Sequence, residues 1–335
     1  MSDYRQRRLS FGETFKIHKK GFTVSDYSFL GLSEKNYRDY LSNIEYIKMH
    51  PINGEYSKWI DDKLTLKYIL SGTDLDEYMP EYYFQIDTFG NVLRLMDCEL
   101  NSSGDALHDL IELLKCKKNL AFKRISGAIG EGFYKASFKE NLFYLNDRSY
   151  SHNEFCNAIK GLKNYLVLEF LKPHPYFGEY CSNTANSIRY LAGRINGKFH
   201  MIKGFIRFGT INSKFIENYN AGGVLCYIDE NGEFTYGNII DKSNMRNLII
   251  HTHPDTGKEI KGIIPLWEDV VKAVNLLDKM FPQCRYFGID FVVTSDNKVK
   301  ILEINSLTSL DALQLDESIL KTPNGEMFFN EMIKR

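Results

Sequence analysis

The chain has 335 residues, of which 43% are hydrophobic, and its formal net charge of −1 gives a pI near 6.7. This is enough to bury a large core, arranged as one large domain or as two to three lobes. The balanced charge argues against nucleic acid and against an anionic membrane surface as partners.

Six cysteines are scattered along the chain without a CxxC pair, which is typical of a reduced, cytosolic protein. No apolar signal segment follows the basic residues near the N-terminus. The longest apolar runs, such as residues 165–170, are far too short to span a bilayer. We therefore expect a cytoplasmic protein without membrane insertion.

Two segments near the N-terminus carry helix signals. Residues 33–50 have Ser33 as a candidate N-cap. Residues 61–72 have helical spacing of apolar side chains, and Gly72 is a candidate C-terminal stop.

From Leu120 the pattern changes to strand, glycine-rich turn and strand. The stretch FKRISGAIGEGFYK places Gly127, Gly130 and Gly132 after Lys123. Glycines let backbone N–H groups approach a phosphate, and a lysine supplies a point charge for it. The stretch is neither a Walker A loop nor a Rossmann fingerprint, and an ordinary flexible hairpin would show the same glycines.

Four further elements follow, each with its own sequence signal. They are a helix opened by the S-x-x-E capping box at 151–154 and closed near Gly161, a buried strand at 165–171, a hairpin turning at Asn196-Gly197, and an amphipathic helix at 265–281 with Val270, Ala273, Val274 and Leu277 on one face. Together these elements predict an α+β fold of antiparallel sheets with packed helices.

Residues 288–306 predict a hairpin that carries an acid in each strand. If its turn centres between Asp296 and Asn297, Asp290 and Glu303 lie directly opposite on one face, with Cβ atoms roughly 4.5–5.5 Å apart. Asn305 shares that face. The other face then carries the predicted core residues Phe291, Val293, Leu302 and Ile304. A β-bulge would shift this register by one residue.

Two opposed carboxylates in an apolar hairpin need a compensating partner. A shared proton, an arginine or a divalent cation would each serve. Two carboxylates and an amide oxygen are hard ligands that suit Mg²⁺, which then usually also binds substrate phosphates. An exposed sheet face with incidental acids is the alternative interpretation.

The order of these elements resembles the ATP-grasp family over about residues 60–315. The resemblance implies an ATP-grasp fold, with ATP held between a small central lobe and a larger C-terminal lobe. It implies a division of labour in which Lys67 (or Lys63) and Lys123 with the glycine loop hold the phosphates, Glu169, Phe170 and Leu171 hold the adenine, and Asp290, Glu303 and Asn305 hold Mg²⁺.

A narrower resemblance is to the sugar-transfer-associated branch of that family, found among bacterial surface-polysaccharide genes. It rests on motifs spread over the second half of the chain, namely His174-Pro175, Asn186 to Arg189, Arg207 and Gly209, Asn220 with Gly222 and Gly223, residues 253–267, and Gln314. Glu-Ile-Asn stands here where Glu-Gly-Asn is commoner in that branch.

The branch resemblance also implies roles for individual residues. His174 would lie at the cofactor, whereas Asn186, Asn220, Gly222 and Gly223 would contact substrate. Arg189 and Arg207 would be catalytic, holding the acceptor carboxylate and the tetrahedral oxyanion. Taken alone, Arg189 fits a structural ion-pair residue better than a catalytic one, and Asn220 with its glycines could be an ordinary turn.

These resemblances divide the chain into residues 1–60, of unclear role, an N-terminal lobe at 61–118, a central lid lobe at 119–168 and a C-terminal lobe at 169–335. They imply an ADP-forming ligase that joins a small carboxylate, such as a sugar acid, to an amine or another nucleophile through an acyl phosphate, in the biosynthesis of a surface polysaccharide or a related sugar conjugate. The alternatives are a phosphotransferase on the same fold and a nucleotide-binding partner protein without chemistry.

Overall fold

A computed structural model describes residues 9–125, 132–213, 217, 219–241, 243–244 and 246–333. The chain forms two compact units. We call Asp61–Lys172 the inserted unit, because it interrupts the discontinuous unit made of Met1–Ile60 and Pro173–Arg335. The expected lobe boundary at residue 118 lies inside the inserted unit. Residues 9–60 share a unit with the C-terminal part of the chain.

The inserted unit is built on a seven-stranded antiparallel sheet in the order β2-β1-β7-β3-β4-β5-β6. Its strands are β1 (Tyr82–Ile86), β2 (Val92–Arg94), β3 (Asn119–Arg124), β4 (Tyr134–Lys139), β5 (Leu142–Leu145), β6 (Arg148–Tyr150) and β7 (Tyr165–Glu169). Its helices are α6 (Lys63–Leu70), α7 (Ala106–Lys117) and α8 (His152–Lys160), with the 3₁₀ turn η3 (Asp76–Tyr78).

Local signals define the ends of these helices. Asp62 caps α6 by accepting a hydrogen bond from the backbone of Thr65, and Gly72 follows the helix with a φ of +73°. The predicted capping box of α8 is confirmed, because Ser151 and Glu154 bond reciprocally and Gly161 is the C-cap. Helices α7 and α8 then bury their apolar faces on one side of the sheet, around Phe122, Phe143 and Phe155.

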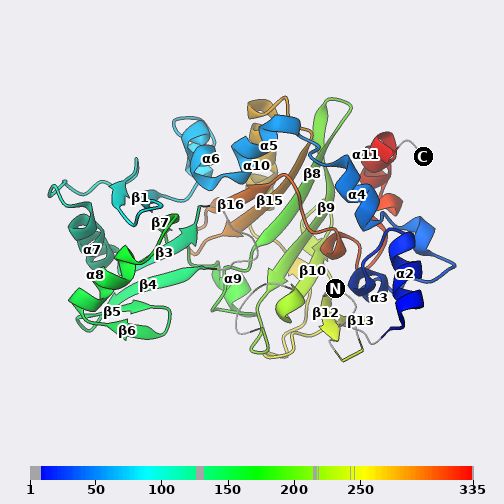
Figure 1. Cartoon of the computed structure of the whole chain (residues 1–335), viewed down its shortest axis with the longest axis horizontal. Helices are drawn as coiled ribbons and strands as arrows, with labels where there is room; N and C mark the ends of the chain where they lie inside the picture. Colours follow the sequence, from blue (N-terminus) through cyan, green and yellow to red (C-terminus); the bar gives the residue numbers. More distant parts are fainter. Residues whose placement is uncertain are drawn as a thin grey trace. The chain divides into compact units, whose positions relative to one another are not determined.

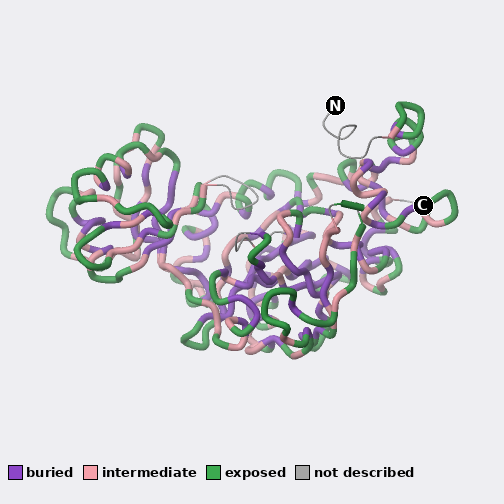
Figure 2. Tube along the Cα trace, turned by 90° about the horizontal axis from the view of Figure 1, so that it is seen from below, coloured by how far each residue is buried: buried purple, intermediate pink, exposed green. Residues whose placement is uncertain are grey.

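The discontinuous unit contains a second seven-stranded antiparallel sheet in the order β13-β12-β10-β9-β8-β15-β16 (Figure 1). Its strands are β8 (Ile188–Ile195), β9 (Lys198–Phe208), β10 (Val224–Ile228), β12 (Gly237–Asp241), β13 (Arg246–Ile250), β15 (Tyr286–Val293) and β16 (Val299–Asn305). A small two-stranded sheet pairs β11 (Glu233–Phe234) with β14 (Gly262–Ile263). All eight residues of β15 are buried, and Figure 2 colours the buried stretches of the chain purple.

The remaining helices belong to the discontinuous unit, apart from one residue of α5. They are α2 (Phe11–Lys19), α3 (Val24–Phe29), α4 (Asn43–Met49), α5 (Ser57–Asp61), α9 (Pro175–Gly178), α10 (Trp267–Met280) and α11 (Pro323–Ile333), with 3₁₀ turns η1 (Tyr37–Asp39), η2 (Gly54–Tyr56), η4 (Tyr219–Ala221), η5 (Asp311–Leu313) and η6 (Ile319–Lys321). No helix in the described ranges is both long and apolar enough to cross a bilayer.

The two faces of this sheet are covered by different helices. Helix α10 buries the four predicted apolar residues, and its Trp267 packs against Tyr190 of β8. The N-terminal helices and α11 share a core with side chains of the opposite face, including Leu191, Phe205 and Tyr286. In Figure 1 α2, α4 and α11 gather at one end of this unit.

The predicted single helix over residues 33–50 is wrong. The segment forms η1 and α4, and Tyr40 between them is extended at φ −103° and ψ 146°. Helix α4 begins after Ser42, because Ser42 and Glu45 form a capping box that Ser33 cannot provide.

Both predicted hairpins are present. Asn196 and Gly197 have φ values of 50° and 84° and connect β8 to β9. In the β15–β16 hairpin, Val293 pairs with Val299, so the turn is one residue tighter than expected. A bulge at Leu302 adds that residue back, and Asp290 still pairs with Glu303. Leu302 is only half-buried and Ile301 is buried instead, so the prediction that Leu302 is a core residue is wrong.

Candidate active site

An acid pair with two arginines forms the polar centre of the large sheet in the discontinuous unit. Asp290 of β15 pairs with Glu303 of β16 on one side and with Arg189 of β8 on the other. Arg189 Nε and Nη2 donate to Asp290 Oδ1 and Oδ2 at 2.6 and 2.9 Å. Arg207 of β9 donates from Nη2 to the same Oδ1 at 3.1 Å. Of the three compensating partners open at the sequence level, the structure places arginine beside Asp290.

The arginines determine the charge state of this buried carboxylate. The Asp290 side chain is only 5% exposed, and burial alone would raise its pKa. Arg189 and Arg207 outweigh burial and hold the pKa of Asp290 well below its ordinary value. Burial likewise opposes the charged form of Arg189, but Asp290 and Glu303 keep the Arg189 pKa above its ordinary value. Asp290 and Arg189 therefore form a buried ion pair.

Arg207 links this centre to a second carboxylate. Its Nη2 donates to Ser187 Oγ at 2.6 Å, and the Ser187 hydroxyl and backbone N–H donate to Glu217 Oε2 at 2.5 and 2.9 Å. Arg207 Nε is buried and has no hydrogen-bond partner among the described residues. A buried donor without an acceptor is unfavourable, so this nitrogen has capacity for an anionic ligand.

The oxygen donors around Glu303 fit a divalent cation. Glu303 Oε1 accepts from Asn305 Nδ2 at 3.2 Å, which places an amide beside the carboxylate. Asp290 accepts three N–H bonds from the arginines, and its side chain also interacts with that of Glu303. Within the described ranges, this hairpin included, no three His, Cys, Asp or Glu side chains are grouped to hold a metal. A metal at this hairpin would therefore use Asn305 and oxygens supplied by a ligand.

Three residues of the discontinuous unit that were predicted to contact substrate or, for His174, the cofactor hold its loops in place. Asn186 is buried at φ 51°, and its side-chain amide bonds to the backbone oxygens of Cys181 and Thr184. Its carboxamide thus fixes the turn that leads into β8. Asn220 donates to Asp311 at 3.4 Å. His174 accepts from the Tyr176 N–H through Nδ1, and its Nε2 lies 3.1 Å from Asn297 Oδ1.

Two glycines are required where the chain enters β10. Gly222 has a φ of +106°. A Cβ on Gly223 would lie 2.8 Å from the backbone oxygen of Glu217 and 3.1 Å from that of Phe208. The missing side chains let the segment that carries Glu217 lie directly against β9.

Apart from His174, the residues predicted to bind the nucleotide lie in the inserted unit. Lys67 is 2% exposed, and its Nζ lies 2.9 Å from Asp76 Oδ1 and 3.0 Å from Asp97 Oδ2. Lys123 lies in β3 and pairs with Leu166 of β7. Gly127 and Gly130 lie outside the described residues.

Gly132 and the end of β7 have defined surroundings. Gly132 has a φ of +77°, and a Cβ there would lie 2.7 Å from the Tyr165 hydroxyl. Glu169 ends β7 and accepts from the Glu81 backbone N–H at 3.3 Å. Phe170 lies under Lys135 Nζ at 4.7 Å, and half-buried Leu171 follows it.

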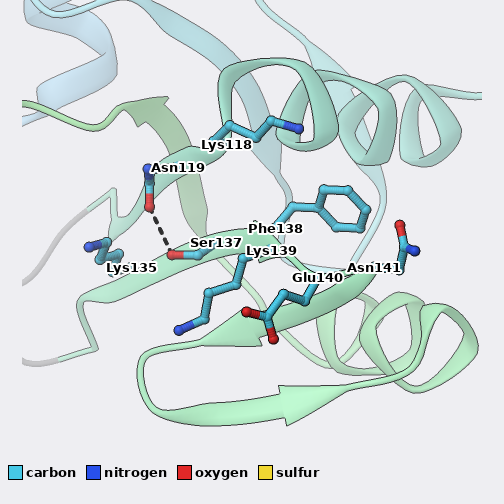
Figure 3. A pocket seen from close by; sticks show the side chains of 8 residues that line it. All are labelled: Lys118, Asn119, Lys135, Ser137, Phe138, Lys139, Glu140 and Asn141. Atoms are coloured by element: carbon cyan, nitrogen blue, oxygen red, sulfur yellow. Dashed lines mark hydrogen bonds between the residues drawn. The ribbon is translucent and has the colours of Figure 1, made fainter.

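A cavity of about 590 Å³ lies on the sheet of the inserted unit (Figure 3). It is on the face of that sheet to which Lys123 also belongs. It is lined by Lys118, Asn119, Lys135, Ser137, Phe138, Lys139, Glu140 and Asn141. Asn119 accepts from Ser137 at 2.9 Å across the β3–β4 pair. Because Lys135 also contacts the Phe170 ring, the cavity adjoins the segment predicted to hold adenine.

Sequence reasoning missed four residues that support the centre. Ser187 could have been found by strand alternation, because it lies two residues before Arg189. Glu217, Tyr46 and Thr308 carried no comparable signal. Tyr46 and Thr308 hydrogen bond to each other and to the Tyr286 hydroxyl at 2.7 to 3.0 Å. Tyr286 lies four residues before Asp290 in β15 and so shares its face of the sheet.

Two antiparallel sheets with packed helices agree with the expected α+β fold class. The family model described as sugar-transfer associated ATP-grasp matches residues 42–324, which is most of the chain. The chain therefore belongs to the sugar-transfer associated ATP-grasp family. No protein with a curated description matches the sequence.

Solved structures with similar coordinates are remote in sequence. D-alanyl-alanine synthetase A from Vibrio cholerae O1 biovar eltor is 12% identical with a TM-score of 0.46, over 84% of this chain and 65% of that chain. The ATP-grasp ligase PsnB with minimal precursor, Mg and ADP is 11% identical with a TM-score of 0.41, over 84% and 62%. N5-carboxyaminoimidazole synthase from Aspergillus clavatus is 11% identical with a TM-score of 0.40, over 84% and 53%. The chain spans less than two thirds of the length of these proteins.

Proposed function

We propose that the chain is an ADP-forming ligase that joins a carboxylate to an amine through an acyl phosphate, in the biosynthesis of a bacterial surface polysaccharide or related sugar conjugate. The observation that carries the proposal is Arg207, whose buried Nε has no hydrogen-bond partner among the residues that the structure describes, while its Nη2 donates to Ser187 and Asp290. A substrate carboxylate would satisfy that donor.

The chemistry needs two displacements. A carboxylate oxygen attacks the γ-phosphorus of ATP, the bond from that phosphorus to the bridging oxygen breaks, and ADP leaves. The amine nitrogen then attacks the carbonyl carbon of the acyl phosphate. The carbon–oxygen bond to phosphate breaks, and the departing phosphate carries away the proton that the nitrogen loses. Both steps depend on positioning and on charge neutralisation.

The residues of the chain would divide this work. Arg207 would hold the substrate carboxylate and later the tetrahedral oxyanion, while Asp290 keeps Arg189 and Arg207 in place. Lys123 would neutralise the phosphates, and Lys67 would do so by exchanging one of its two aspartates for phosphate. Asp290, Glu303 and Asn305 would hold Mg²⁺, which would stabilise the negative charge of the phosphates.

Phosphorus NMR tests the proposal directly. The protein is mixed with MgATP and a pool of nucleotide-linked uronic acids, amino acids and amines, and product masses are recorded in parallel. ADP, free phosphate and a condensed mass lacking one water are expected. Arg207→Ala should remove the condensed product and Glu303→Gln should remove turnover, whereas Lys321→Ala, which changes an exposed pair with Asp39, should alter neither. Phosphate retained on the acceptor would mean a phosphotransferase instead, and MgATP binding without any turnover would mean a binding partner.

A further inference from the structure

A second cavity, of about 380 Å³, lies within the discontinuous unit. Its walls come from two segments far apart in sequence, and the lining residues are Thr23, Asp26, Asn43, Tyr46, Ile47, Leu307, Thr308, Ser309, Leu310 and Asp311. Thr23 and Asp26 precede residue 42, where the match to the family model begins. Part of this cavity is therefore built by residues outside the matched range.

The cavity adjoins the acid pair through one residue. Thr308 lines it and packs on Gly288, where an added Cβ would lie 2.0 Å from Thr308 Cγ2. Gly288 pairs with Asn305 and lies two residues before Asp290 on the same face of β15. A molecule in this cavity would therefore contact Thr308, which itself packs on Gly288, two residues before Asp290 in β15.

The wall on this side is fixed before any ligand binds. The Tyr46 hydroxyl lies 3.0 Å from Thr308 Oγ1, and the Tyr286 hydroxyl lies 2.7 Å from that of Tyr46 and 2.8 Å from Thr308. All three side chains are buried. On the other side, Asn43 accepts from the Thr23 N–H at 3.2 Å and donates to Asp26 at 2.5 Å.

The lining has one sign of charge. Asp26 and Asp311 are carboxylates, and none of the described residues that line the cavity is Lys, Arg or His. Hydroxyls and an amide make up most of the other polar groups. Such a wall repels an anion and favours a cation that can also accept and donate hydrogen bonds. The arginine centre has the opposite preference, because Arg207 Nε has capacity for an anion.

We infer that this cavity binds the amine-bearing substrate, a small hydroxylated molecule whose ammonium group pairs with Asp26 and Asp311. Naming that molecule as the nucleophile rests on the proposed ligase function, whereas the binding preference rests on the cavity alone. The two substrates would bind at sites of opposite charge. The carboxylate substrate would bind at Arg207, and the amine substrate in the cavity that Asp26 and Asp311 line. Residues 9–60 would then contribute directly to substrate selection.

Methyl NMR on the full chain, without ATP, tests the inference. Ile47 reports on the cavity and Ile263 of β14, which does not line it, is the control signal. The probes are D-glucosamine, its neutral analogue N-acetyl-D-glucosamine, and anionic D-glucuronate, with ethanolamine as a minimal amine. We expect the two amines to shift Ile47 and not Ile263, while the neutral and anionic sugars leave Ile47 unchanged.

Variants then test the carboxylates. Asp26→Asn with Asp311→Asn should weaken glucosamine binding at least about tenfold, a change of about 1.4 kcal/mol. Glu268→Gln in α10 removes a negative charge that does not line the cavity and should have no such effect. Equal binding of N-acetyl-D-glucosamine, stronger binding of glucuronate, unchanged affinity in the double variant, or no Ile47 shift with either amine overturns the inference. Amine binding without ATP turnover would retain the site and reject the ligase function.

Discussion

Replacing Arg189 by alanine should destabilise the discontinuous unit by an amount that its geometry predicts. Arg189 makes two charge-assisted bonds to Asp290, at 2.6 and 2.9 Å, between side chains that are 12% and 5% exposed. Removing one partner of a buried ion pair costs about 3–5 kcal/mol, because the other charge stays buried. Arg207 still contacts Asp290 at 3.1 Å, so we expect about 3 kcal/mol.

Urea unfolding at neutral pH, followed by tryptophan fluorescence, measures this loss. Both tryptophans, Trp59 and Trp267, lie in the discontinuous unit, so the signal reports on that unit. The midpoint should fall while the slope stays unchanged. Lys321→Ala is the matched control, because its pair with Asp39 is 59% and 47% exposed and should contribute about 0–1 kcal/mol.

A double variant separates the pair from its surroundings. If Asp290 is the charge left unpaired, adding Asp290→Asn to Arg189→Ala should cost less than the sum of the two single changes. A loss below about 1 kcal/mol in Arg189→Ala, or strict additivity in the double variant, would refute the buried-pair reasoning.

Three further changes have defined outcomes. The pKa of Asp290 is lower in the folded than in the unfolded chain. The ionised Asp290 carboxylate therefore stabilises the fold above the ordinary aspartate pKa of 3.8, and this stabilisation is lost as the pH falls below that value. In a plot of the urea midpoint against pH, Asp290→Asn should therefore flatten the acid side. Gly288→Ala should cost about 1–3 kcal/mol by overpacking against Thr308, and adding Thr308→Ser, which removes the clashing methyl, should recover most of the melting temperature. Asn53→Ala should cost about 1–3 kcal/mol in a thermal melt, because the Asn53 carboxamide bonds both the N–H and the C=O of Tyr286 in the buried strand.

The hairpin shows what local sequence pattern could and could not predict. Alternation along the two strands was enough to oppose Asp290 and Glu303, although the turn is one residue tighter than expected and a bulge at Leu302 restores the register. Because the tighter turn and the bulge shift the register by one residue in opposite directions, Asp290 still pairs with Glu303. Leu302 lies at the bulge itself, and the prediction that it is a core residue is wrong. Alternation along a strand shows which of its residues share a face of the sheet, whereas the turn and any bulge set the register with the neighbouring strand.

The partners of the acids were beyond local pattern. Arg189 and Arg207 were named from resemblance, but their pairing with Asp290 depends on which strands lie side by side, a property of the whole sheet. Glu217 and Tyr46 reach the centre from segments about 30 and 140 residues from Ser187 and Arg189 in sequence, without periodic signal of their own. The prediction of one helix over residues 33–50 was wrong for a local reason. The capping box at Ser42 starts the helix there, and Ser33 provides no such cap.

The interruption of one unit by the other has a consequence for how the protein is made. Gln314 bonds both the N–H and the C=O of Leu41, and Ser318 donates to the Asp39 carbonyl, so the first segment is held by residues near the end of the chain. On the ribosome, residues 61–172 can complete their sheet as soon as they emerge. Apolar residues of the first segment, such as Phe22 and Leu41, must wait for the strands after residue 173 before they are buried. We therefore expect the nascent chain to expose the apolar residues of the first segment until the strands after residue 173 and the loop carrying Gln314 have been made, which makes this segment a natural target for a chaperone.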